Sequence, residues 1–458
     1  MNKRLLIILA AAIIVRLFLF GFLYVQNSPE FFVLGDSNGY LRIANNIALG
    51  NGFTQATEPP YLPDSMRVPL FPAVLAASLY IFGSYLPVIF LQIFLSAIIV
   101  YFTYRFTFLI TEREKLALVA AGLMAFEPYS IFISTSVLTE TLFTALLVAG
   151  AYMAARFTHV PAWRPLAAAS ALFGFAALVR PIGEFLPLIL IVLVMTRMPA
   201  KQYGKYLALA VIPFLIVVGP WLARNQLTFG VPALSSGGLQ NAYSDLAGAV
   251  VAYRDRISWP EAKQKLEEDF ARRHEFDVAI IQQDLSKSPE LFKEGIGIML
   301  AHPKYTALVA ASIALTFFTN DAWTYYLQRW EILPRYDITF SPTYTLVTEG
   351  PAVAARKIIE NTGPTLLVPL IGRLFWVAVS MLFFIGIGAL MWQGGKQRLY
   401  GTFLLLLVLY FLALSSSVGL GINGRFRYPV HSFFFTAAAV GGSVIVNWIR
   451  QRVRVLKA

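Results

Sequence analysis

Long apolar runs separated by short polar segments are the main pattern of this sequence. The runs are 15 to 25 residues long, close to the roughly 20 apolar residues that an α-helix needs to cross a bilayer. The pattern predicts an all-α polytopic membrane protein with about 10–13 transmembrane helices. We place the clearest spans at 5–25, 85–106, 116–134, 137–156, 165–180, 183–197, 206–223, 366–392, 399–418 and 429–448.

Basic residues gather in the segments between alternate spans, where 16 bases face only two acids, Glu112 and Glu114. The positive-inside rule predicts that these segments and both termini are cytoplasmic. The bases are Lys3, Arg4, Arg105, Arg113, Lys115, Arg156, Arg164, Arg197, Lys201, Lys205, Lys396, Arg398, Arg450, Arg452, Arg454 and Lys457.

Two further apolar pieces, 68–83 and 303–319, would reverse this sidedness if either crossed the membrane alone. Both begin at prolines, which suits interfacial or re-entrant helices. With these two kept from spanning, segments 26–84, 224–302 and 320–365 lie outside the cytoplasm. We read residues 5–25 as an uncleaved first helix, because no small-x-small cleavage site follows Val25.

Composition supports a membrane protein and changes the meaning of the charge. Apolar residues make up 57% of the chain and charged residues 14%, whereas soluble domains average about 45–50% and about 25%. The net charge of +12 comes largely from the cytoplasmic segments, so it is a topology signal and predicts no nucleic-acid partner. The chain has no cysteine, which excludes disulfides and thiolate metal sites.

Candidate chemistry lies on the outer side of the predicted topology. Asp36 precedes a short amphipathic helix in the first outer loop, and Glu140 stands at the outer end of an apolar span. Either carboxylate could simply cap its own helix. Four arginines, Arg180, Arg224, Arg425 and Arg427, lie at outer span ends. Any one of them could extend to lipid headgroups, but four beside two carboxylates indicate a site.

These residue types suit transfer from a lipid phosphate. The planar guanidinium of arginine matches phosphate oxygens, and a carboxylate opposite can take a proton from an acceptor hydroxyl or amine. This chemistry alone does not select a sugar. Two lone polar groups have a simpler reading: Arg16 is expected to face a neighbouring helix, and Glu127, before Pro128, is expected at the interface.

Several motifs occur in a fairly specific order: Gly35-Asp36-x-x-x-Tyr40, Ala44, Gly50-x-Gly52-Phe53, Arg67-x-Pro69-Leu70-x-Pro72, Thr139-Glu140, Trp221-x-x-Arg224-Asn225 and Arg425-x-Arg427-Tyr428. In this order they resemble the polyprenyl-phosphate-sugar-dependent glycosyltransferases with the C-type membrane fold. The bacterial relatives of protein O-mannosyltransferases and of the lipid A aminoarabinose transferase are the most similar branch. The resemblance is good over 1–225, moderate over 365–458 and weak between them.

The resemblance implies inverting transfer of one sugar from a polyprenyl-phosphate donor, of the undecaprenyl-phosphate type, to an acceptor outside the cytoplasm. It implies that Asp36 is catalytic, as the general base, with Glu140 as a second catalytic carboxylate. Many relatives carry two adjacent acids in the first loop, whereas this chain has Asp36-Ser37. Donor-phosphate binding falls on Tyr40, Arg67, Arg224, Arg425, Arg427, Tyr428 and Arg180.

A metal is not favoured. The four histidines, His159, His274, His302 and His431, have no ligand spacing. His431 could orient a carboxylate, but we expect a packed or interfacial residue. Asp36 with Glu140 could hold a divalent cation, but we expect a metal-independent mechanism and no other cofactor. No glycine-rich nucleotide loop is present, which argues against a sugar-nucleotide donor.

The predicted organisation is a transmembrane catalytic module over 1–225 that includes the first outer loop, 26–84. A variable acceptor-side segment over 226–364 and C-terminal helices over 365–458 follow. The expected location is a bacterial inner membrane, with the site facing the periplasm and a lipid, glycan or protein as acceptor. Two alternatives stay open: an oligosaccharide ligase or polymerase with a polyprenyl-diphosphate donor, and a transporter or flippase of lipid-linked substrates.

Overall fold

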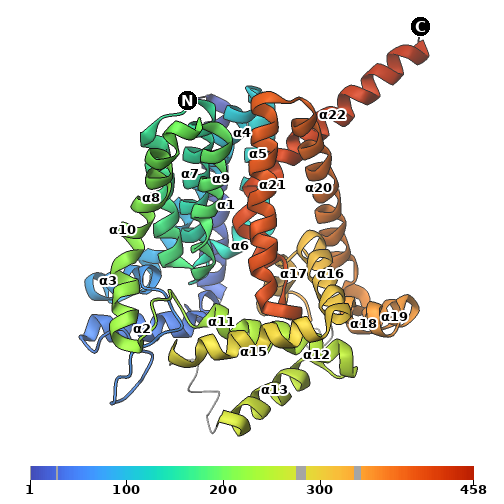
Figure 1. Cartoon of the computed structure of the whole chain (residues 1–458). Helices are drawn as coiled ribbons and strands as arrows, with labels where there is room; N and C mark the ends of the chain where they lie inside the picture. The colour runs from blue at the N-terminus through green and yellow to red at the C-terminus, as the bar shows by residue number, and fades with distance from the viewer. Residues whose placement is uncertain (1, 27–28, 275–284, 335–341, 458) are drawn as a thin grey trace.

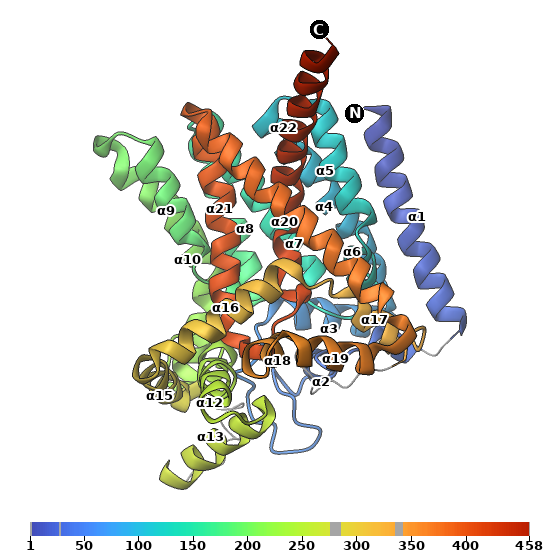
Figure 2. The same ribbon diagram turned by 90° about the vertical axis from the view of Figure 1, so that its right-hand side faces the viewer.

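The computed structural model describes residues 2–26, 29–274, 285–334 and 342–457, and parts of the predicted outer segments lie outside these ranges. It is a bundle of long helices with a layer of shorter helices at one end (Figures 1 and 2). The bundle helices are α1 (Lys3–Gln26), α4 (Leu86–Thr111), α5 (Glu114–Phe126), α7 (Glu140–His159), α8 (Trp163–Val179), α9 (Leu186–Arg197), α10 (Tyr203–Phe229), α20 (Leu367–Trp392), α21 (Gly395–Ser415) and α22 (His431–Lys457).

The prediction of an all-α polytopic membrane protein is confirmed. Within the described ranges, seven helices are long and apolar enough to cross a membrane, or eight if the bent pair of α15 and α16 is one span. The bundle helices α5, α8 and α9 lie in predicted intervals but fall short of that length, because prolines limit them: Pro128 follows α5, Pro181 follows α8 and Pro187 begins α9. The residues that the structure describes contain no β-strand.

Both termini lie at one end of the bundle, and the predicted outer segments lie at the other end (Figures 1 and 2). The outer end carries α2 (Ser37–Leu49), α3 (Leu70–Phe82), α11 (Gly237–Asn241), α12 (Gly248–Asp255), α13 (Trp259–His274), α15 (Ser288–Ala301), α16 (Pro303–Thr319), α17 (Trp323–Arg329), α18 (Pro342–Thr348) and α19 (Pro351–Thr362). The short helix α6 (Pro128–Ile133) lies within the bundle.

The two apolar segments 68–83 and 303–319, which were expected not to span, form helices α3 and α16, and the two helices take different courses. Helix α3 is only 13 residues long and packs on α2 at the outer end. Helix α16 follows α15 after a bend of 104°, at His302-Pro303, and reaches back between the layer and the bundle beside α20 (Figure 2). Neither piece carries the chain to the opposite end, so the loop before α3 and the start of α7 lie at the same end.

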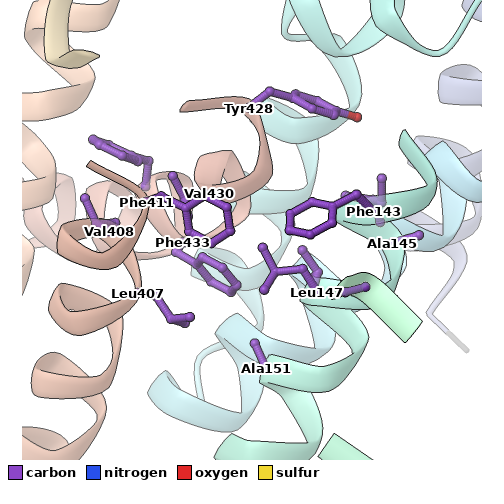
Figure 3. Packing of buried hydrophobic residues seen from close by; sticks show 14 of the residues in the cluster. Phe143, Ala145, Leu147, Ala151, Leu407, Val408, Phe411, Tyr428, Val430 and Phe433 are labelled. Carbon is purple, nitrogen blue, oxygen red and sulfur yellow. The ribbon is translucent and has the colours of Figure 1, made fainter. Parts of the chain in front are cut away.

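Close packing joins the N-terminal and C-terminal helices. Phe143, Leu147 and Ala151 of α7 face Phe411 of α21 and Phe433 of α22 across a fully apolar contact (Figure 3). Helices α20 and α22 approach even more closely, through Gly386 and Gly441. A Cβ atom on Gly386 would lie 1.9 Å from the carbonyl oxygen of Ala437, so this contact requires glycine.

Buried polar groups tie the bundle together near its middle. Arg16 of α1 donates to the carbonyl of Ala125 (2.9 Å) and to Ser130 Oγ (2.5 Å), as expected for an arginine that faces a neighbouring helix. The expectation that Glu127 is interfacial is wrong. Its side chain is buried, accepts the N–H groups of Tyr129 (3.1 Å) and Ser130 (2.6 Å), and lies 3.4 Å from His431 Nδ1. Pro128 starts α6, and Glu127 caps it.

Candidate active site

Five charged side chains form a cluster at the outer end, which we call the carboxylate–arginine cluster: Asp36, Arg67, Glu140, Arg180 and Arg425. Arg425 is its centre. Its Nη2 lies 2.8 Å from Asp36 Oδ2, and its Nε donates to Glu140 Oε1. The two predicted carboxylates, 104 positions apart in the sequence, therefore share one guanidinium.

Local structure explains why the Asp36 carboxylate is not used to cap its own helix. It occupies the N-cap position of α2 but makes no capping hydrogen bond. The next residue, Ser37, anchors the helix start instead. Its Oγ accepts the N–H of Leu34 (2.9 Å) and donates to the carbonyl of Val137 (2.7 Å), just before α7. Because Val137 leads into Glu140, this hydrogen bond holds the two carboxylates near each other.

The two carboxylates differ sharply in exposure. The Glu140 side chain is 0% exposed, whereas that of Asp36 is 39% exposed. Glu140 Oε1 also lies 2.6 Å from Arg180 Nη1, so two arginines neutralise it inside the protein. Of the two carboxylates, Asp36 is the one that a substrate can reach.

The electrostatic surroundings keep Asp36 ionised. Burial alone would raise the pKa of its carboxyl group, but Arg425 and Arg67 beside it lower that pKa from its usual 3.8 to about 2. Asp36 is therefore a carboxylate at neutral pH.

Arg67 completes the outer side of the cluster. Its Nη2 lies 3.3 Å from Asp36 Oδ1, and its Nη1 donates to Tyr40 Oη (3.2 Å). The guanidinium also stacks over the Tyr40 ring at 4.6 Å. The backbone N–H of Arg67 donates to Asp64 Oδ1 (2.8 Å), which fixes the loop before α3.

A cavity of about 540 Å³ opens beside Arg67, and we call it the loop-one cavity. Gly35, before α2, and Gly39, on α2, both line it, and the absence of a side chain at Gly39 lets Gln55 pack there, since a Cβ would lie 2.9 Å from Gln55 Oε1. Arg42 gives it a second cation that the sequence analysis did not single out. Its lining residues are Gly35, Gly39, Arg42, Gln55, Ala56, Thr57, Met66 and Arg67.

Arg224 lies outside the cluster and supports loop one from α10. Its guanidinium stacks on Trp221 (4.7 Å) and Phe53 (5.5 Å), and its Nη1 donates to the carbonyl of Asp64 (3.0 Å). Asp64 in turn accepts from Arg67, so Arg224 acts on the cluster through that loop. Burial raises the pKa of Asp64. The sequence analysis missed Asp64, because nothing in its pattern distinguishes it from an ordinary loop acid.

The structure does not bring Arg427 and Tyr428 to the cluster. Arg427 is fully buried, donates to the carbonyls of Phe317 and Asn320 (2.5 Å to Asn320), and lies 3.5 Å over the Trp376 ring. Tyr428 is also fully buried, among the apolar side chains between α7 and α22 (Figure 3). The expectation that these two residues bind the donor phosphate is therefore corrected: they join η8 (Gly424–Val430) to α16 and the bundle. Arg427, two residues after Arg425 in this 3-10 turn, lies on a different side of the turn.

Metal ligands do not gather here. Over the described parts of the chain, no group of three or more histidine, aspartate or glutamate side chains is close enough to hold a metal ion. Between Asp36 and Glu140, the position that a bridging cation would take is filled by the guanidinium of Arg425.

Comparison with known proteins shows which family and which fold this chain is similar to. Residues 63–223 match the family described as dolichyl-phosphate-mannose-protein mannosyltransferase, a range that holds Arg67, Glu140 and Arg180. The archaeal oligosaccharyltransferase AglB from Archaeoglobus fulgidus, in complex with an inhibitory peptide and a dolichol-phosphate, superposes with a TM-score of 0.52 at 12% identity, over 99% of this chain and 51% of that one. The chain has the C-type membrane glycosyltransferase fold.

Two further solved structures are similar. The Archaeoglobus fulgidus oligosaccharyltransferase in complex with zinc and sulfate gives a TM-score of 0.54 at 14% identity, over 98% of this chain and 50% of that one. ArnT from Cupriavidus metallidurans, bound to undecaprenyl phosphate, gives 0.42 at 15% identity, over 96% and 77%. No curated protein matches the sequence.

The predicted resemblance to polyprenyl-phosphate-sugar-dependent glycosyltransferases is confirmed as a family match over residues 63–223 and as a shared fold over nearly the whole chain. The chain spans about half the length of the oligosaccharyltransferases with which it shares the C-type fold. Asp36 and Arg425 lie outside the range of the family match.

Proposed function

We propose that this C-type protein transfers one sugar from a polyprenyl-phosphate donor, of the undecaprenyl-phosphate type, to an acceptor at the outer end of the bundle. The observation that carries the proposal is an accessible, ionised carboxylate, Asp36, held between Arg67 and Arg425 at the side of the loop-one cavity. The match to dolichyl-phosphate-mannose-protein mannosyltransferases and the dolichol-phosphate in the AglB complex support a lipid-phosphate donor.

In the proposed step, the acceptor oxygen or nitrogen attacks the anomeric carbon from the face opposite the phosphate. The bond from that carbon to the phosphate oxygen breaks with its electron pair, and the configuration inverts. The acceptor proton passes to Asp36, and the polyprenyl phosphate leaves as an anion. Arg67 and Arg425 stabilise the charge that builds on the phosphate, and Tyr40 keeps Arg67 oriented.

A general base with a pKa of about 2 is weak, since proton transfer is most efficient when the pKa lies near the working pH. The same two arginines that lower this pKa are the ones that we assign to the donor phosphate. When the phosphate draws Arg67 and Arg425 toward itself, Asp36 loses part of its counter-charge and becomes more basic. Donor binding thus prepares the base for the acceptor.

Glu140 is proposed as a positioning residue. It is buried and holds Arg425 from the side opposite Asp36, while Arg180 balances its charge. Asp36 and Glu140 do not touch directly but act on one guanidinium. This arrangement fixes the direction in which Arg425 presents its remaining N–H groups to a phosphate.

We propose that the reaction needs no metal, because Arg425 fills the position between the carboxylates and, with Arg67, supplies the positive charge at the leaving group.

We further propose that the protein lies in a bacterial inner membrane with both termini in the cytoplasm. The 16 bases of the predicted cytoplasmic segments, and the location of both termini at one end of the bundle, support this orientation.

The purified protein in lipid nanodiscs tests the proposal. It is given a panel of undecaprenyl-phosphate sugars, the matching diphosphates and a membrane extract, with and without EDTA, and mass spectrometry follows each donor. We expect loss of a monophosphate donor, gain of one sugar on an acceptor, and no effect of EDTA. Consumption of diphosphate donors alone would favour a ligase or polymerase. Unchanged donors in every arm would count against a transferase.

A further inference from the structure

A further cavity lies at the end of the bundle that carries both termini, opposite the carboxylate–arginine cluster, and we call it the hairpin cavity. Its volume is about 220 Å³. It lies between two helical hairpins, α4 with α5 and α20 with α21, and beside α22. Asn2 donates to Glu114, the first residue of α5, so the N-terminus lies at this same end. The polar residues of the lining are Thr111, Arg113, Gln393, Gln397, Ser443 and Asn447.

Arg113 is the charged residue of this cavity. Glu112 and Glu114 flank it in the chain, but neither of them lines the cavity. The backbone N–H of Arg113 donates to Thr111 Oγ1 (3.3 Å), whereas its exposed guanidinium makes no hydrogen bond and no ion pair among the described residues. The planar N–H groups of arginine match the oxygens of a phosphate. The cavity is therefore suited to an anion, and to a phosphate in particular.

Gln397 adds an acceptor that the protein leaves unused. Its Nε2 donates to the carbonyl of Ile110 (3.0 Å), which ties α21 to the end of α4. Its Oε1 is buried and has no hydrogen-bond partner among the described residues. A buried acceptor without a partner is unfavourable, and a hydroxyl group of a ligand would satisfy it. The lining thus suits a ligand that carries both an anionic group and a hydroxyl group.

The face of α22 that lines the cavity continues beyond it as a basic face. Asn447 lines the cavity, and Arg450 and Arg454 follow three and seven residues later, so the three side chains lie on one side of the helix. Both arginines are exposed, on the part of α22 that runs past the neighbouring helices (Figures 1 and 2). Basic side chains beside a polar cavity at the cytoplasmic side of membrane helices favour anionic lipid headgroups.

Apolar side chains next to the cavity favour a lipid over a soluble anion. Trp392 directly precedes Gln393 and is 90% exposed, and tryptophan is enriched where membrane helices meet the headgroup region. Phe108, one turn before Thr111 on α4, is 42% exposed, and Val444 in the lining is 39% exposed. A lipid whose headgroup occupies the cavity can lay its acyl chains along these side chains.

We infer that the hairpin cavity binds the headgroup of an anionic phospholipid of the phosphatidylglycerol class, which carries a phosphate and hydroxyl groups. Arg113 binds the phosphate, and Gln397 accepts a headgroup hydroxyl. Because the cavity joins α4 and α5 to the three C-terminal helices, the bound lipid stabilises the contact between them by mass action. The inference depends on the membrane location of the bundle and is independent of the transferase chemistry.

Lipid binding to the full-length protein in a neutral detergent tests the inference. Native mass spectrometry follows phosphatidylglycerol and phosphatidylcholine with the same acyl chains. We expect wild-type protein to bind phosphatidylglycerol at least about tenfold more tightly, as for a charge-assisted contact. Arg113→Ala should lose most of this preference, and Arg113→Lys should keep part of it. The matched control is Arg164→Ala, an exposed arginine at the same end, on α8 and outside the lining, which should keep the full preference.

Equal binding of the two lipids by wild-type protein would overturn the inference, as would a full preference in Arg113→Ala. Soluble glycerol phosphate is added as a competitor, and displacement of phosphatidylglycerol at equal affinity would show a site for a soluble anion instead. The midpoint of thermal unfolding without lipid verifies the fold of each variant. If Arg113→Ala does not fold, the double variant Arg450→Ala with Arg454→Ala, beyond the packed bundle, replaces it. It should bind phosphatidylglycerol more weakly, and unchanged binding would count against the inference.

Discussion

At the scale of single residues, the proposed mechanism depends on the difference between two carboxylates. Asp36 is accessible and Glu140 is sealed inside the protein, although both contact Arg425. Only the accessible group can take a proton from an acceptor. The buried group can act only through the arginine that it holds.

Asp36→Asn keeps the volume of the side chain but removes its ability to accept a proton. We expect kcat to fall about 10²–10⁴-fold, the usual contribution of general-base catalysis. The midpoint of thermal unfolding should fall modestly, because the ion pairs of Asp36 with Arg67 and Arg425 weaken, although no capping hydrogen bond of α2 is lost. The control is Asp255→Asn, which removes an acid from the Arg254 ion pair on α12. Near-normal turnover of Asp36→Asn would refute the role as base.

The pH dependence follows from the pKa of the same group. Arg425 and Arg67 lower the pKa of Asp36 to about 2, so the free enzyme keeps this carboxylate ionised at every pH above about 4. We therefore expect protonation of Asp36 to cause no fall in kcat/KM for the donor between pH 8 and pH 5. The stabilising contribution of this group is complete above the ordinary pKa of 3.8 and disappears as the pH falls toward 2. An acidic limb near pH 6 that vanishes in Asp36→Asn would contradict this assignment.

Arg67→Lys tests the donor side. A lysine keeps the charge but cannot reproduce the planar pair of N–H groups or the stack on Tyr40. We expect the KM for the donor to rise about tenfold, measured by donor titration at saturating acceptor. Arg105→Lys is a closely matched control. Arg105 also lies near a tyrosine ring, that of Tyr152 at 5.6 Å, and donates to its hydroxyl (3.0 Å), but it lies in a predicted cytoplasmic segment.

The sequence predicted most of the cluster, since Asp36, Arg67, Glu140, Arg180 and Arg425 all come together. It could not separate Arg425 from Arg427, two positions apart, because both are arginines at the start of an apolar span. The short η8 turn sends one to the cluster and the other to carbonyls in the bundle. The position of Glu127 was predicted wrongly for a similar reason. Glu127 caps α6, and the sequence pattern of a capping carboxylate does not show whether its helix lies inside the protein or at its surface.

At the scale of elements, the lengths of the apolar runs predicted the long bundle helices well, but they did not predict the breaks and bends between helices. The long apolar runs became helices near their predicted limits, but Pro128 divides one run into α5 and α6. The course of α16 depends on a bend at His302-Pro303 and on contact with α20, which are tertiary features. The glycine contact between α20 and α22 was also invisible in the sequence, since glycines are frequent in membrane helices.

Gly386→Ala is expected to destabilise the protein. The added Cβ would lie 1.9 Å from the carbonyl oxygen of Ala437, so α20 and α22 must move apart, and η8, which leads into α22, moves with them. Overpacking of this kind costs about 1–3 kcal/mol or more, which should lower the midpoint of thermal unfolding in detergent. Gly388→Ala, on the same helix, meets nothing within 4 Å and should leave the midpoint unchanged or raise it. Equal midpoints for the two variants would show that this contact is not tight in solution.

At the scale of the whole molecule, the cluster joins regions that are far apart in the chain. Asp36 belongs to loop one, Glu140 to α7, and Arg425 to the segment between α21 and α22. The domain limits predicted at 225 and 365 stay predictions, but the cluster shows that the first and last of these regions contribute to one site.

A split protein makes this dependence measurable. Cutting the chain between Gly394 and Gly395, in the turn between α20 and α21, separates Asp36 and Glu140 from Arg425. We expect neither fragment to turn over donor, and co-expression to restore activity through the apolar contacts of α7 with α21 and of α20 with α22. Donor turnover by residues 1–394 alone would show that Arg425 is dispensable.

The late place of Arg425 in the chain has a consequence for biosynthesis. A ribosome releases the last site residue only after nearly every helix has been made, so a half-inserted nascent protein carries Asp36 and Glu140 without the guanidinium that joins them. In the proposed mechanism, such an intermediate lacks the positive charge of Arg425 that stabilises the leaving phosphate. The carboxylate–arginine cluster can therefore assemble only after the segment between α21 and α22 has been made.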